Sequence, residues 1–124
     1  MERGSDNEVA WIIRVCKAAV RSSPPVELEA EALFFRAIVY QKIAGQKKGD
    51  LRKRWEKREY QSYERIIGLS GCPPDILARA MINKATVDYE ADPGSDWQQQ
   101  FKRAREIPGI SLQVRRHIDR SLGL

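Results

Sequence analysis

Apolar residues recur along the chain at intervals of three and four positions, which is the spacing of one face of an α-helix. Val9, Ile12, Ile13 and Cys16 begin this pattern, which predicts a first helix that runs to about Arg21. No segment alternates apolar and polar residues over any length, and the sequence contains no Asn-Gly or Asp-Gly hairpin turn. The pattern therefore predicts an all-α protein.

Proline, glycine and capping residues divide the remaining pattern into further helices. Pro24 and Pro25 open a second helix, because proline is tolerated in the first turn. The second helix runs to about Ala44, the third from its N-cap Asp50 to Ile67, and the fourth from Pro73 and Pro74 to Asp92. Ser95 opens a fifth helix with a capping box, and this helix passes through Ala104. Ser111 caps a sixth. Five to six short helices with short connections predict a compact bundle, in a single domain over residues 1–124.

The second predicted helix is the most apolar segment of the chain, which predicts a central position in the bundle. Its apolar residues are Leu33, Phe34, Ala37, Ile38 and Ile43. In the fourth helix we expect an inward-facing set of Ile76, Leu77, Ala80, Met81 and Val87.

Positive charge is concentrated in one window of the chain. Residues 42–58 hold eight basic and two acidic residues, so the net charge of this window, +6, exceeds the +5 of the whole chain. A concentrated basic patch is the electrostatic footprint of a protein that binds a polyanion, most often nucleic acid. The alternative is a solvated helix face without a ligand.

A helical wheel separates the third predicted helix into two halves. The apolar half, which we expect to pack on the bundle, carries Leu51, Trp55, Tyr63, Ile66 and Ile67. The opposite half carries Lys53, Arg54, Lys57, Arg58, Gln61 and Arg65, with Glu64 as the acid of this arc and with Lys47 and Lys48 extending it from the preceding loop. Arg52 lies off the arc. Such a row of cations predicts contacts with the phosphates of a nucleic acid.

Three aromatic residues are interleaved with these charges. Trp55 and Tyr63 have the spacing of core residues, and stacking on bases is the alternative for both. Tyr60 falls nearer the basic arc and is the best candidate for stacking on a base.

A second basic group flanks the Pro108-Gly109 turn and consists of Lys102, Arg103, Arg105, Arg115, Arg116 and Arg120. The stretch from Ile107 to Ile118 resembles a helix-hairpin-helix, a family that grips a duplex phosphate through backbone N–H groups of a Gly-hydrophobic-Gly turn. Here Ser111 replaces the second glycine, and Arg115 or Val114 replaces the usual small residue of the second helix. An ordinary connection between helices is the alternative.

Catalytic and metal-binding patterns are missing from the sequence. The segment from Gly45 to Asp50 is not a P-loop, because its glycines are too close and no Lys-Ser/Thr pair follows. The single histidine, His117, leaves little scope for acid–base chemistry, and Cys16 and Cys72 with His117 do not complete a four-ligand zinc site. We expect a protein that is not an enzyme and has no cofactor and no metal.

The longest apolar stretch near the N-terminus, Val9 to Val20, is interrupted by Arg14 and Lys17. It is too short to span a bilayer and lacks a signal-peptide cleavage pattern. We therefore expect a cytoplasmic protein without a membrane partner.

A small, basic, all-helical chain without a catalytic pattern resembles the small helical subunit of CRISPR effector (Cascade-type) complexes. The resemblance lies in the overall profile of the chain, not in a signature motif. It implies a subunit that is present in several copies and holds the backbone of a guide–target duplex or displaced strand through lysine and arginine, here the arc from Lys53 to Arg65. Two alternatives are an independent duplex-DNA binder that works through the Pro108-Gly109 turn and a protein adaptor whose basic face meets an acidic partner. A role at a membrane surface is weaker, because the core needs the aromatic half of the third helix.

Overall fold

The computed structural model describes residues 10–14 and 25–124, and all the regular secondary structure in these ranges is helical. The prediction of an all-α fold is thereby confirmed. Five helices follow one another along the chain: α2 (Val26–Gly45), α3 (Gly49–Ile67), α4 (Pro74–Ala91), α5 (Trp97–Arg105) and α6 (Leu112–Ser121). Residues 10–14 are also helical, whereas the rest of the predicted first helix lies outside the described residues.

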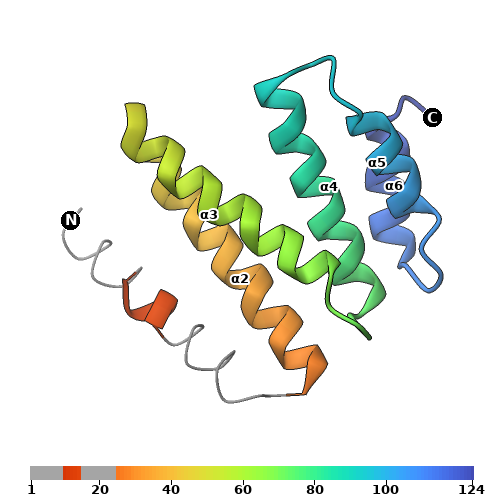
Figure 1. The fold of residues 1–124 in the computed structure, drawn as a ribbon. Helices are drawn as coiled ribbons and strands as arrows, with labels where there is room; N and C mark the ends of the chain where they lie inside the picture. The colour runs from red at the N-terminus through yellow and green to blue at the C-terminus, as the bar shows by residue number, and fades with distance from the viewer. Residues whose placement is uncertain (1–9, 15–24) are drawn as a thin grey trace.

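Helix α4 holds the fold together, because it contributes to two separate cores. Figure 1 shows α2 and α3 side by side and antiparallel, with α4 next to them and α5 and α6 on its far side. Ala80 joins Leu33, Ala37, Tyr63 and Ile66 in one core. The other core combines α4 with the last two helices and contains Ala78, Ile82, Ala85, Phe101, Ala104, Val114 and Ile118. The small side chains of α4 let helices approach it from both sides.

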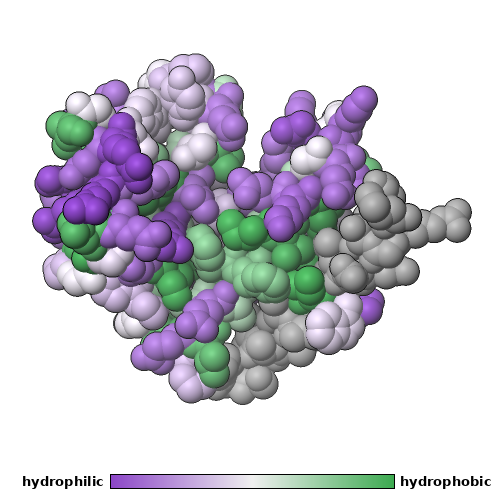
Figure 2. All heavy atoms as spheres, turned by 180° about the vertical axis from the view of Figure 1, so that it is seen from behind, coloured by the Kyte–Doolittle hydropathy of each residue, from purple (hydrophilic) through white to green (hydrophobic). Residues whose placement is uncertain are grey.

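The central position that the sequence predicts for α2 belongs to α4, because within the described residues α2 packs mainly on α3. Leu33, Ala37 and Ile43 are buried, and Phe34 is half-buried. Leu28 and Phe35, however, remain exposed. Seen from behind in Figure 2, apolar side chains gather across the middle of the molecule, while hydrophilic side chains dominate the side formed by α5 and α6.

The helix ends agree with the prolines and glycines of the sequence, but two predicted caps are wrong. Helix α3 begins at Gly49 and its N-cap residue is Lys48, so Asp50 lies in the first turn. The N-cap of α5 is Asp96, and the Ser95 hydroxyl is buried without a hydrogen-bond partner in the described structure. By contrast, the Ser111 side chain accepts a 3.3 Å hydrogen bond from the Val114 amide and caps α6 as predicted.

The buried stripe of α3 differs from the predicted apolar half. Tyr63 and Ile66 are buried, but Leu51 and Ile67 are exposed. Their places are taken by Glu59 and Ser62, because the stripe is set by where α2 and α4 dock on the helix. Each of these polar side chains has a local partner. The Tyr63 hydroxyl donates to Glu59 over 2.7 Å, and the Ser62 hydroxyl donates to the Arg58 carbonyl over 3.0 Å.

Candidate nucleic-acid interface

Helix α3 presents one continuous basic surface, which we call the α3 basic face. All of its predicted members, Lys53, Arg54, Lys57, Arg58, Gln61 and Arg65, are exposed. The opposite side of the helix is buried against α2 and α4, so the charged residues lie on the side that is exposed. Lys48 is exposed and Lys47 half-buried in the turn that precedes the helix.

The centre of the α3 basic face is free of intramolecular ion pairs within the described residues. Lys53, Arg54 and Lys57 have no carboxylate within 4 Å there. At the edges, Arg65 lies 3.8 Å from the Glu29 carboxylate, and the Arg58 guanidinium stacks 4.5 Å from the centroid of the Trp55 ring. An exposed ion pair of this length is weak, so most cations of the α3 basic face are available to bind an external anion.

Trp55 and Tyr63 pack inside the protein, as predicted. Tyr63 is fully buried, and its hydroxyl is bonded to Glu59. Trp55 is half-buried with its ring centroid 5.7 Å from that of Tyr40. Burial raises the pKa of the Glu59 carboxyl, and repulsion from Glu56 and Glu90 acts in the same direction, while the Tyr63 hydrogen bond opposes the rise.

Tyr60 lies beside the α3 basic face and turns toward α4. Its ring is half-buried, with the Lys84 ammonium 5.1 Å from its centroid. Burial raises the pKa of its hydroxyl. Tyr60 lines a groove of about 740 Å³ that runs between α3, α4 and α5 and that we call the α3–α5 groove. Arg103 of α5 lines the same groove, so the structure brings together two residues that the sequence assigned to separate basic groups.

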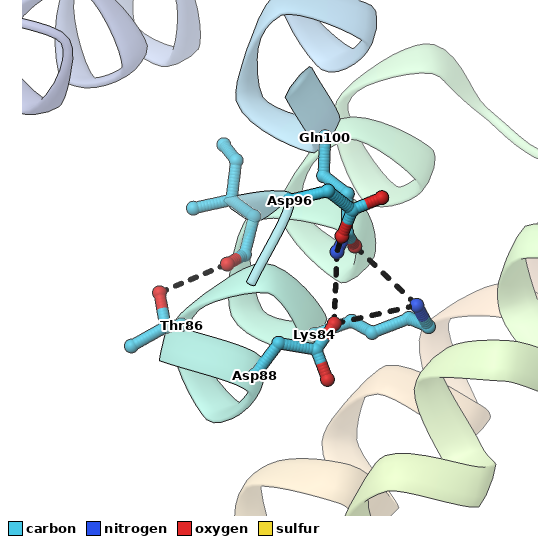
Figure 3. Close-up of polar contacts among 6 residues, drawn as sticks. Lys84, Thr86, Asp88, Asp96 and Gln100 are labelled. Atoms are coloured by element: carbon cyan, nitrogen blue, oxygen red, sulfur yellow. Dashed lines mark hydrogen bonds and ion pairs between the residues drawn. The ribbon is translucent and has the colours of Figure 1, made fainter. Parts of the chain in front are cut away.

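A polar network around the buried Gln100 joins α4 to α5 (Figure 3), and its side chains line the α3–α5 groove. The Gln100 side-chain amide donates to Asp88 and to Asp96, each over 2.8 Å. Lys84 donates to the Gln100 oxygen over 3.3 Å and pairs with Asp88 at 3.6 Å. Because every member of the network has a partner, it fixes α5 against α4 and holds the groove wall in place.

The remaining members of the second basic group do not line the α3–α5 groove. Arg105 pairs with Asp119 at 2.5 Å, and this carboxylate raises the pKa of the guanidinium. Lys102 and Arg105 line a separate hollow beside the end of α6. Arg115 and Arg116 are exposed on α6. Arg116 and Arg120 line another hollow together with Asp119, so these two members lie around α6 and not at the α3–α5 groove.

The Pro108-Gly109 turn is engaged by α4, which counts against the helix-hairpin-helix alternative. The Ser111 N–H, one of the backbone donors that would face a phosphate, donates to Asp75 over 2.7 Å. Gly109 has a φ of +87°, and a Cβ built on it would lie 3.2 Å from the Pro74 ring. A carboxylate of the protein thus sits where the hairpin motif would hold a phosphate.

The described residues contain neither a cluster of metal ligands nor a helix that could span a membrane. No group of three or more histidine, cysteine, aspartate and glutamate side chains in these residues is arranged to hold a metal ion. None of the described helices is both long and apolar enough to cross a membrane.

Sequence reasoning missed the groove and the role of Lys84 in it. The four-residue spacing of Lys84 and Asp88 signals an ion pair on α4, but no sequence pattern places α5 opposite Tyr60.

Comparisons with protein families, with curated proteins and with solved structures found no match for this chain.

Proposed function

We propose that the protein is a non-catalytic nucleic-acid-binding subunit that holds the phosphate backbone through the α3 basic face. The observation that carries the proposal is the exposure of Lys53, Arg54 and Lys57 on one helix side, without an ion pair in the described structure. Phosphate contacts of this kind give affinity without sequence specificity.

The dimensions of the face suit a polynucleotide backbone. From Lys53 to Arg65 the helix rises about 18 Å at 1.5 Å per residue. Each strand of a duplex carries one phosphate per about 3.4 Å of helix axis, and successive phosphates lie farther apart than this because the strand winds around the axis. A straight face of this length can therefore contact a few phosphates of one strand.

The proposal includes the setting in which the subunit acts. Similarity in size, charge and helical content to the small subunit of CRISPR effector complexes supports a role in the cytoplasm within a multisubunit ribonucleoprotein. Several copies of the chain and other protein subunits would be its partners there. The backbone in question would be that of a guide–target duplex or a displaced strand.

Charge reversal tests the function directly. The quadruple variant K53E/R54E/K57E/R58E should lose detectable binding in a fluorescence anisotropy titration, with an unchanged helical circular dichroism spectrum. The wild-type affinity should fall with salt, with a slope of log K against log salt of about −3 to −4 for four neutralised phosphates.

The matched control is K102E/R115E/R116E/R120E, which makes the same change in net charge on α5 and α6. It should retain most of the affinity. Retention by the α3 variant, or an equal loss in both variants, would overturn the assignment of the function to the α3 basic face. A protein adaptor without a nucleic-acid role would give no salt-sensitive binding for any variant.

A further inference from the structure

We propose that the α3–α5 groove receives an unstacked base of a single strand whose phosphates lie on the α3 basic face. This inference rests on the proposed function and names its substrate class as single-stranded nucleic acid. Tyr60 connects the two surfaces, because it lies one helical turn from Lys57 and two turns from Lys53. A strand held by these lysines passes the edge of the groove.

The lining of the groove supplies the side chains that stack on bases. Tyr60 of α3 and Arg103 of α5 both line it, and they come from elements that make no packing contact with each other in the described structure. Aromatic rings and guanidinium planes are the two groups on which unpaired bases stack. Met81 and Ile67 add apolar surface for the faces of a base. The volume of about 740 Å³ is within the range of small-ligand sites.

The charges of the groove favour a base over a phosphate. Glu64, Asp88 and Asp96 line it, and carboxylates repel phosphates but accept hydrogen bonds from the amino groups of bases. Lys84 and Arg103 also line it, but Lys84 is paired with Asp88, whereas Lys53 and Lys57 are exposed on the α3 basic face and do not line the groove. The phosphates would therefore stay on the basic face while the base turns inward.

A duplex does not satisfy this site. Its bases are paired and stacked, and moving one out costs a few kcal/mol, whereas a flexible single strand presents its bases freely. The site therefore predicts a preference for single strands that the α3 basic face alone would not produce.

The test compares three fluorescein-labelled probes of about 15 nucleotides: a mixed-sequence single DNA strand, its duplex and an abasic strand. We expect the wild-type protein to bind the single strand about five-fold or more tightly than the other two. Y60A should lose about five-fold on the single strand and nothing on the abasic strand, and R103A should lose more on the single strand than on the abasic strand. Y60F keeps the ring and should recover most of the affinity that Y60A loses, whereas R116A, which removes an exposed arginine outside the groove, should bind like wild type.

The outcomes separate the two proposals. If the three probes bind equally and Y60A has no effect, while K53E/R54E/K57E/R58E abolishes binding, base insertion is overturned and the function stands. If that reversal leaves binding unchanged, the proposed function itself fails. Should Y60A unfold, R103A gives the answer, because a loss of equal size on the single strand and on the abasic strand would overturn base insertion.

Discussion

The carboxylate of Asp75, in the first turn of α4, accepts a 2.7 Å hydrogen bond from the backbone N–H of Ser111, 36 residues further along the chain. The carboxylate thereby gives a hydrogen-bond partner to a backbone N–H at the start of α6. Its negative charge also interacts favourably with the positive end of the α6 dipole. The contact joins α4 and α6 at the Pro108-Gly109 turn, for which the sequence suggested phosphate binding.

We predict that D75A lowers the free energy of unfolding by about 1–3 kcal/mol, because it leaves a half-buried amide donor without its charged partner. D75N keeps an oxygen at the same position and should recover part of the loss. Urea denaturation followed by circular dichroism measures both. Equal stabilities of D75A and wild type would show that the contact contributes nothing.

Gly109 offers a test of the same junction through the backbone. G109A should destabilise the protein by about 1–2 kcal/mol, because alanine is strained at a φ of +87° and its Cβ would approach the Pro74 ring. The matched control is G45A at the end of α2, where the backbone has no positive φ and a Cβ has open space. That variant should be as stable as wild type or more so. Thermal unfolding of the two variants gives the comparison.

The network around Gln100 predicts a difference between neighbouring glutamines. Q100A removes three hydrogen bonds from a buried side chain and should cost about 1–3 kcal/mol. Q99A changes an exposed residue of the same helix and should stay within about 0.5 kcal/mol of wild type. Hydrogen exchange of the α5 amides should accelerate in Q100A alone, since the network fixes α5 on α4.

Glu59 makes stability depend on pH. Burial raises its pKa in the folded protein above the ordinary carboxyl value, so folding favours the protonated form. Its stabilising contribution is complete below the ordinary carboxyl pKa and is lost as the pH rises through the raised value.

We therefore predict that E59Q, which keeps an oxygen for the Tyr63 hydroxyl but carries no charge, is more stable than wild type at pH 8. The difference should narrow as the pH falls. E64Q, at an exposed position of the same helix, provides the control and should show no such trend. Urea titrations from pH 4 to pH 8 follow both, and a constant difference between E59Q and wild type would contradict the prediction.

Local signals predicted much of the fold, and tertiary packing decided the rest. Ser111 caps α6 because an N-cap needs only a hydroxyl and a nearby amide. Ser95 has the same residue type, but its hydroxyl is buried at the groove wall instead. On α3 the apolar residues are sparse, so the docking of α2 and α4 determined that Glu59, and not Leu51, is buried.

The candidate site also has one part that the sequence predicts and one part that depends on tertiary packing. The α3 basic face follows from helical periodicity along one segment, so its exposed residues were predictable from that segment alone. The position of Arg103 on the same groove as Tyr60 depends on how α5 packs against α4, through the Gln100 network. Periodicity carries no information about how such distant segments are arranged.

The packing around α4 also bears on how the chain reaches its fold. No described helix packs against one more than two places away in the order from α2 to α6. Contacts between near neighbours in sequence require little loop closure, and helical proteins of this kind fold in about microseconds to milliseconds. The α2–α3 pair can therefore close while the C-terminal helices are still being synthesised, and α4 then provides the surface on which they assemble.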